Sequence, residues 1–171
     1  MGLKFICNVG DWLQQSWIDE AFHSSGFKAP LDLFSKENQS LHEEDIKAVN
    51  SGYSLDQFYY TLIERQHLSF ELLEIPGVHQ GQIHWWITRM TPGQFMPVHR
   101  DPRITTKKNI QRYWMPWTDW ECGHIFCYED IVISEYQKGD LFLMENPDAL
   151  HGAANIGLTP RMSLNIGVER L

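Results

Sequence analysis

The sequence predicts a single, mainly β domain of the jelly-roll or barrel type, with helices covering one outer face. Its length of 171 residues suits one domain. With 43% apolar and 21% charged residues, the composition is that of a globular protein rather than a disordered one. The second half of the chain carries many short strand-like runs at regular spacing, which is typical of jelly rolls and barrels.

The first half shows helical spacing of its apolar residues. We expect helices at Asp11–His23, Ser40–Val49 and Ser54–Leu73. The first could be capped by Asp11, and the second begins with a capping-box pattern in which Glu43 follows three residues after Ser40. Residues 1–77 therefore form a predicted helical N-terminal part.

The second half alternates apolar runs with turn signals such as Lys138-Gly139-Asp140 and Asn146-Pro147-Asp148. β-Branched and aromatic residues are frequent in these runs, as in strands. The predicted strands are Gln82–Met90, Ile110–Trp117, His124–Tyr128, Ile131–Tyr136, Leu141–Glu145, Leu150–Ile156 and Arg161–Val168. Residues 82–168 are thus the predicted β core of one domain spanning 1–171.

Charge and cysteine content narrow the classes of partner. The net charge is -8 and no long basic run is present, so a phosphate backbone would be repelled and no nucleic acid partner is expected. No apolar run is long enough to span a bilayer, so we expect no membrane association. The odd number of scattered cysteines, three, predicts reduced thiols and a cytoplasmic protein.

A candidate metal site begins at His99 and Asp101. Residues two apart on an extended segment point to the same side, so this imidazole and this carboxylate can reach one cation. His151 is the expected third ligand. Two histidines and one carboxylate form the facial triad of non-haem iron(II) oxygenases, which leaves the opposite side of the metal open.

A candidate anion site lies on the last predicted strand. Strand alternation puts Arg161, Ser163 and Asn165 on one side, and it puts the apolar residues Met162, Leu164, Ile166 and Val168 on the other. The apolar side would pack against the helices, so Arg161 and Ser163 would point inward. An inward guanidinium requires an anion, and it can bind a carboxylate through two hydrogen bonds.

In these motifs and in their order, the stretch from about Gln82 to Val168 resembles the Fe(II)/2-oxoglutarate-dependent oxygenase superfamily. The shared marks are His99-x-Asp101, then His151, then Arg161-x-Ser163. The stretches Met90–Phe95 and Lys138–Leu143 also look like the family. The resemblance implies a double-stranded β-helix fold, with iron(II) held by the two histidines and the aspartate. It also implies that Arg161 and Ser163 bind the far carboxylate of 2-oxoglutarate.

The resemblance further implies the reaction: O₂ is consumed, 2-oxoglutarate is converted to succinate and CO₂, and a substrate is hydroxylated. Halogenating relatives have a small residue in place of Asp101, so its presence favours hydroxylation. The expected substrate is a peptide side chain or a small molecule. DNA-repair demethylases carry a second Arg six residues after the first, and Gly167 at that position argues against that group.

The segment Gln111–Pro116 leaves the subfamily open, because two resemblances assign its inward face differently. Likeness to the aspartyl/asparaginyl β-hydroxylase group would turn Arg112 and Trp114 inward. Likeness to prolyl-hydroxylase-like members would turn Tyr113 and Met115 inward. On a regular strand only one can hold, so Arg112 and Tyr113 are competing candidates for cosubstrate binding.

Two readings outside the oxygenases also remain. One is a cupin-like metalloprotein with another divalent metal and a different activity, because three nitrogen and oxygen ligands do not choose iron over manganese or zinc. The other is a non-catalytic binding module on a jelly roll. Only the oxygenase interpretation requires a dicarboxylate bound by Arg161 beside the metal.

Overall fold

A computed structural model describes residues 2–29, 60–99, 110–146 and 148–169. In these ranges the chain forms two antiparallel β-sheets and one α-helix. The elements in chain order are β1 (Leu3–Asn8), α1 (Gln15–His23), β2 (Phe27–Ala29), β3 (Tyr60–Glu64), a 3₁₀ turn (Arg65–His67), β4 (Gln82–Met90), β5 (Phe95–His99), β6 (Ile110–Pro116), β7 (His124–Tyr128), β8 (Ile131–Ile133), β9 (Asp140–Met144), β10 (His151–Asn155) and β11 (Arg161–Glu169).

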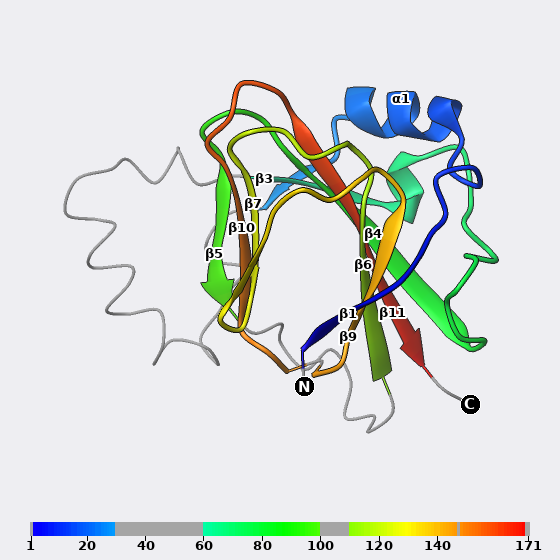
Figure 1. The fold of residues 1–171 in the computed structure, drawn as a ribbon. Helices are drawn as coiled ribbons and strands as arrows, with labels where there is room; N and C mark the ends of the chain where they lie inside the picture. Colours follow the sequence, from blue (N-terminus) through cyan, green and yellow to red (C-terminus); the bar gives the residue numbers. More distant parts are fainter. Residues whose placement is uncertain (1, 30–59, 100–109, 147, 170–171) are drawn as a thin grey trace.

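The two sheets face each other (Figure 1). The major sheet has seven strands in the order β1-β9-β6-β11-β4-β3-β2, and the minor sheet has four in the order β5-β10-β7-β8. From β4 to β11 the chain winds between them: β4, β6, β9 and β11 lie in the major sheet, and β5, β7, β8 and β10 in the minor one. This antiparallel winding is the double-stranded β-helix, so the predicted fold is confirmed.

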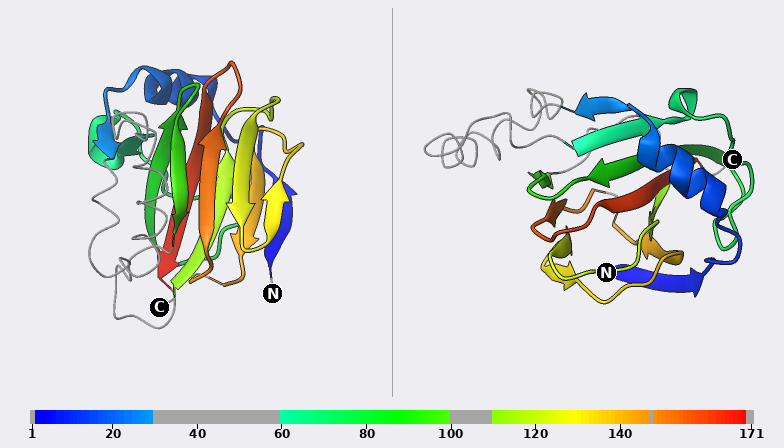
Figure 2. Two further views of the ribbon diagram at one scale, coloured as in Figure 1. Left: turned by 90° about the vertical axis from the view of Figure 1, so that its left-hand side faces the viewer. Right: turned by 90° about the horizontal axis from the view of Figure 1, so that it is seen from above.

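Two hydrophobic clusters hold the sheets in place. The outer cluster lies between α1 and the outer face of the major sheet and contains Ile18 and Ala21 of the helix; Figure 2 shows α1 running across that sheet. The inner cluster lies between the two sheets and includes Trp114, Phe126 and Tyr136. Strands β3, β4, β6 and β9 therefore divide their side chains between two buried environments.

β11 shows this division as the sequence predicted. Its apolar residues Met162, Leu164, Ile166 and Val168 all lie in the outer cluster. Arg161 and Ser163 are buried on the other face and line the interior cavity. β11 is also the central strand of the major sheet, paired with β4 and β6, so its residues are held on both sides.

The predicted helical N-terminal part needs correction. α1 begins at Gln15 rather than near Asp11, and no side chain caps its start. The expected helix Ser54–Leu73 is wrong over its described part, because Tyr60–Glu64 is strand β3. Ser40–Val49 lies outside the described residues.

The error at β3 has a physical cause. Over so short a stretch, the spacing of its apolar residues is compatible with both the helical and the strand period. Pairing with β4 supplies hydrogen bonds to the backbone and favours the strand. Ile63 then enters the outer cluster and Tyr60 the inner one. The N-terminal strand β1, which pairs with β9, was also missed.

Strand boundaries in the β core agree closely with prediction. β4 and β7 have the predicted limits, β6 and β11 differ by one residue at one end, and β9 and β10 differ by one residue at both ends. β8 ends at Ile133, well before the predicted end at Tyr136. The predicted turn before β9 contains Gly139 at a φ of +85°, where a Cβ would lie 2.5 Å from the backbone nitrogen of Gly10.

Candidate active site

Two of the three predicted metal ligands lie side by side. β5 and β10 are neighbours in the minor sheet, and His99 is the direct partner of His151 across them. The ring centroids are 4.5 Å apart, and both side chains are buried and line the interior cavity. Directly opposed residues share one face of a sheet, so both imidazoles can reach one metal ion.

A hydrogen bond orients the His151 ring. Its Nδ1 lies 3.0 Å from the carbonyl oxygen of Ala149, so Nδ1 carries the proton and Nε2 keeps its lone pair. Burial and the neighbouring His99 lower the pKa of His151 to about 3, although the Ala149 carbonyl acts in the opposite direction. The ring is therefore neutral near pH 7, as a metal ligand must be.

The third predicted ligand, Asp101, lies outside the described residues. Within the described ranges, no three or more His, Cys, Asp and Glu residues are grouped so that they could hold a metal. His124 is buried, with Nε2 3.0 Å from the carbonyl oxygen of Thr159, and His84 lines the cavity from β4. Both are strand residues, on β4 and β7, and neither is paired with His99 or His151 across the sheet.

The guanidinium of Arg161 is buried between the two sheets, with 1% of the residue exposed. Its Nε donates to the hydroxyl of Tyr136 at 3.3 Å, and its Cζ lies 5.6 Å from the ring centroid of Trp114 and 5.9 Å from that of Phe126. Among the residues that the structure describes, Nη2 has no hydrogen-bond partner. Burying a cation is costly unless an anion lies beside it.

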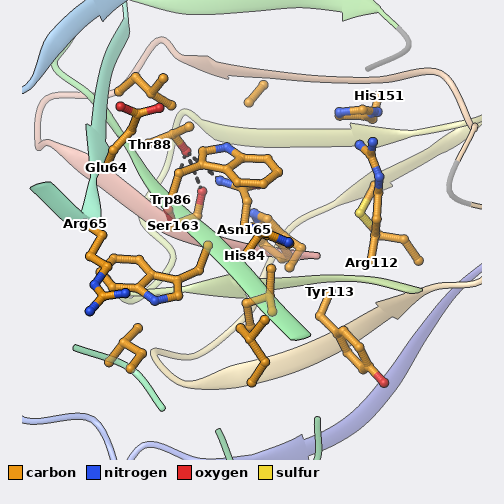
Figure 3. Close-up of a pocket in the computed structure, with 18 of the residues that line it drawn as sticks. Glu64, Arg65, His84, Trp86, Thr88, Arg112, Tyr113, His151, Ser163 and Asn165 are labelled. Carbon is orange, nitrogen blue, oxygen red and sulfur yellow. Dashed lines mark hydrogen bonds between the residues drawn. The ribbon is translucent and has the colours of Figure 1, made fainter. Parts of the chain in front are cut away.

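Ser163 belongs to a hydrogen-bonded row on the inner face (Figure 3). Asn165 Nδ2 donates to Thr88 Oγ1 at 3.4 Å, and Thr88 Oγ1 lies 2.9 Å from Ser163 Oγ. If the Thr88 hydroxyl donates to Ser163, the Ser163 proton points to the cavity. Asn165 lies on the face that strand alternation predicted for it, whereas Thr88 was missed, although alternation along β4 would have placed it on the inner face.

Pairing with β11 decides which side of β6 faces the site. Trp114 packs in the inner cluster, whereas Tyr113 and Met115 pack in the outer one. Arg112 points toward His151 in Figure 3. Burial lowers the pKa of Arg112, and the charge of Asp148 acts in the opposite direction.

Tyr113, the competing candidate for cosubstrate binding, packs on the opposite side of β6 from Arg112, although it too is among the residues that line the cavity. Its hydroxyl lies 3.2 Å from Oε1 of Gln111 and accepts from the backbone nitrogen of His79 at 3.4 Å. Both contacts are made from the outer side of β6, while Arg112 takes the inner side.

The candidate ligand-binding side chains of both sheets share a cavity of about 840 Å³. The histidine pair, Arg112 and Arg161 line it together with Ser163. The wall continues along β3 and β4 with Glu64, His84 and Trp86. The cavity is large enough for a small dicarboxylate and part of a second molecule.

Comparisons with known proteins bear on the fold. No family model and no curated protein matches the sequence. Solved structures that are similar include an uncharacterised Klebsiella pneumoniae protein with a double-stranded β-helix domain (19% identity, TM-score 0.39, 54% of this chain and 71% of that one). Also similar is an RmlC-like cupin from Desulfovibrio desulfuricans, with 16% identity, a TM-score of 0.42 and coverage of 66% of this chain and 84% of that one. A third is a predicted oxalate decarboxylase from Thermotoga maritima, with 13% identity, a TM-score of 0.38 and coverage of 51% of this chain and 66% of that one.

At these identities and TM-scores the likenesses say nothing about activity. The strand order itself identifies the fold. No helix in the described ranges is both long and apolar enough to cross a membrane. The chain is a double-stranded β-helix protein with a buried pair of histidines and two buried arginines around one cavity.

Proposed function

We propose that the protein is an Fe(II)- and 2-oxoglutarate-dependent oxygenase that hydroxylates a peptide side chain or a small molecule. The observation that carries this proposal is Arg161, a buried cation whose Nη2 has no hydrogen-bond partner in the described ranges, in the same cavity as His99 and His151. Metal binding alone would not need this arginine. A dicarboxylate that reaches from the metal to Arg161 would.

The residues fit such a ligand set. His99 and His151 would hold the iron, together with Asp101, and the Ala149 carbonyl keeps the His151 ring in the right tautomer. Iron(II) with 2-oxoglutarate supplies O₂ activation, releasing succinate and CO₂.

The other residues bind, orient and exclude water. Arg161 would take the far carboxylate through Nη2, assisted by the Ser163 hydroxyl. Trp114 and Phe126 cover the guanidinium and keep water from it, which strengthens the ion pair. Arg112, beside His151, is a second cation for the metal-proximal end of the same anion.

A cupin-like metalloprotein with another divalent metal is the alternative. It is favoured by the histidine pair, because neutral imidazoles bind zinc, copper and nickel as readily as iron. The two proposals differ in what they require of Arg161.

The test is calorimetric titration of 2-oxoglutarate into iron(II)-loaded protein under anaerobic conditions. The parent should bind, and Arg161→Ala should raise the dissociation constant by roughly tenfold to a thousandfold, since a desolvated charge-assisted pair is lost. Arg161→Lys should be intermediate because it keeps the charge without the planar fork.

Arg65→Ala is the matched control. Arg65 lines the same cavity but is largely exposed and paired with Glu71 at 2.5 Å, so its removal should leave 2-oxoglutarate affinity unchanged. A parent protein that binds metal but no 2-oxoglutarate would move the cupin-like alternative ahead.

A further inference from the structure

Trp86 differs from the other tryptophans of the chain. There are seven in the sequence, and six of them lie in or against the two hydrophobic clusters: Trp12, Trp17, Trp85, Trp114, Trp117 and Trp120. Trp86 belongs to neither cluster and stacks on no aromatic ring in the described part of the chain. It is half-buried and lines the cavity. An indole held on a cavity wall without core partners has its ring face available to a ligand.

Its neighbours across the sheet are polar. Glu64 on β3 and Asn165 on β11 are the direct partners of Trp86. Neighbouring strands lie about 4.8 Å apart, so the three side chains form one row on the inner face. The Asn165 amide nitrogen donates to Thr88, which turns its carbonyl oxygen away from that bond. We call Glu64, Trp86 and Asn165 the β3–β4–β11 wall.

The charge of this wall is negative. Glu64 is exposed, and its carboxylate is held in place by Gln66 Nε2 at 2.8 Å and by the backbone of the 3₁₀ turn that follows. A carboxylate has about four acceptor sites, so two such bonds leave others for a ligand. The nearby cation Arg65 is already paired with Glu71. The Glu64 carboxylate therefore gives the surroundings of the Trp86 indole a net negative charge.

The wall is also distant from the anion site. Asn165 and Arg161 are four residues apart on β11, a separation of about 13 Å at strand rise. A cosubstrate carboxylate at Arg161 and a second molecule at the wall could occupy the cavity together.

We propose that the β3–β4–β11 wall binds a cationic nitrogen group, an ammonium or a guanidinium, of the primary substrate. This inference rests on the proposed oxygenase function. A cation over the Trp face is the strongest pairing of its kind, and the Glu64 carboxylate adds an ion pair at the same place. The Asn165 carbonyl oxygen offers a further acceptor for the N–H groups. The substrate is then a basic amino-acid side chain or a small amine that reaches the histidine pair from the wall.

The test uses Nα-acetyl-arginine amide and its uncharged analogue Nα-acetyl-citrulline amide, with the lysine and norleucine compounds as a second pair. Each is titrated calorimetrically into protein loaded with iron(II) and 2-oxoglutarate, without oxygen. At least one cationic compound should bind at least tenfold more tightly than its neutral partner.

Variants then locate the binding. Trp86→Leu and Glu64→Gln should each weaken the binding of the cation by roughly threefold to thirtyfold, and Trp86→Phe should lose less because it keeps an aromatic face. Glu74→Gln is the control, since Glu74 is an exposed acid that does not line the cavity. Glu64→Gln keeps the hydrogen-bond acceptor for the 3₁₀ turn, so it tests charge rather than folding.

Three outcomes would overturn the inference: equal binding of the charged and neutral compounds, no binding of either cation, or unchanged binding in both Trp86→Leu and Glu64→Gln. The oxygenase proposal fails separately, if the parent binds no 2-oxoglutarate. Repeating the cation titration on metal-free protein then shows whether the wall binds cations on its own.

Discussion

Replacing Arg161 by Met together with Tyr136 by Phe should stabilise the cosubstrate-free protein. In the parent, Nη2 of Arg161 is buried and no described residue supplies an acceptor for it; an unsatisfied buried donor costs about 1–3 kcal/mol. The double variant removes this group. It also removes both partners of the Nε–Tyr136 bond, an exchange that is close to neutral when both groups are replaced by apolar ones.

The contacts with the aromatic rings nearly cancel. Arg161 lies over Trp114 at 5.6 Å and Phe126 at 5.9 Å, worth about 0.5–2 kcal/mol each. A methionine sulfur in the same place regains about 0.3–1.5 kcal/mol per ring. What remains is the gain from removing the unsatisfied Nη2 group, so the free energy of unfolding of the double variant should rise by about 1–3 kcal/mol.

Urea unfolding followed by circular dichroism measures this. With a slope of about 2 kcal/mol per molar urea, the midpoint should rise by about 0.5–1.5 M. Arg161→Met alone should be less stable than the double variant, because it leaves the Tyr136 hydroxyl buried without its partner. A midpoint for the double variant about 1 M below the parent would refute the reasoning and make Arg161 a structural residue.

Bound 2-oxoglutarate should stabilise the parent more than the double variant. At a concentration a hundred times its dissociation constant, 2-oxoglutarate should stabilise the iron-loaded parent by about 2.7 kcal/mol. At the same concentration it should stabilise the double variant by about 1.4 kcal/mol or less, because the dissociation constant is expected to be at least tenfold higher. Arg161 would then lower the stability of the cosubstrate-free protein and provide 2-oxoglutarate binding in return.

Three further predictions concern the site and the thiols. His99→Ala and Asp101→Ala should each greatly weaken iron(II) binding while circular dichroism shows a folded domain; full iron affinity in both would contradict the proposed ligands. Thr88→Val removes the hydroxyl that lies 2.9 Å from Ser163 Oγ. It should weaken 2-oxoglutarate binding by roughly threefold to tenfold, which corresponds to about one neutral hydrogen bond. Unchanged affinity in calorimetry would show that Ser163 binds the cosubstrate without this neighbour. All three cysteines are free in the structure, so thiol titration under denaturing, non-reducing conditions should find three thiols and no disulfide.

Local patterns in the sequence were enough for much of the β core. Along β11 the alternation of polar and apolar residues assigns Arg161 and Ser163 to one face, because the side-chain period of a strand is two. The turn signals around Gly139 mark strand limits for the same local reason. His99 and His151 could be named as a pair from motif order, and the structure places their rings 4.5 Å apart.

Other features depend on pairing between distant segments. Both faces of β6 carry large side chains, so only its register with β11, which sets Trp114 opposite Asn165, decides that Arg112 and Trp114 take the inner face and Tyr113 the outer one. β3 suits a helix or a strand by its own pattern, and its pairing with β4 selects the strand. Burial is likewise set by what packs opposite, so only the folded chain shows that Trp86 lies outside both hydrophobic clusters while the other six tryptophans lie in or against them. The sequence determined which chemical groups are present and which face each takes on its own strand, and the tertiary structure decided which faces meet.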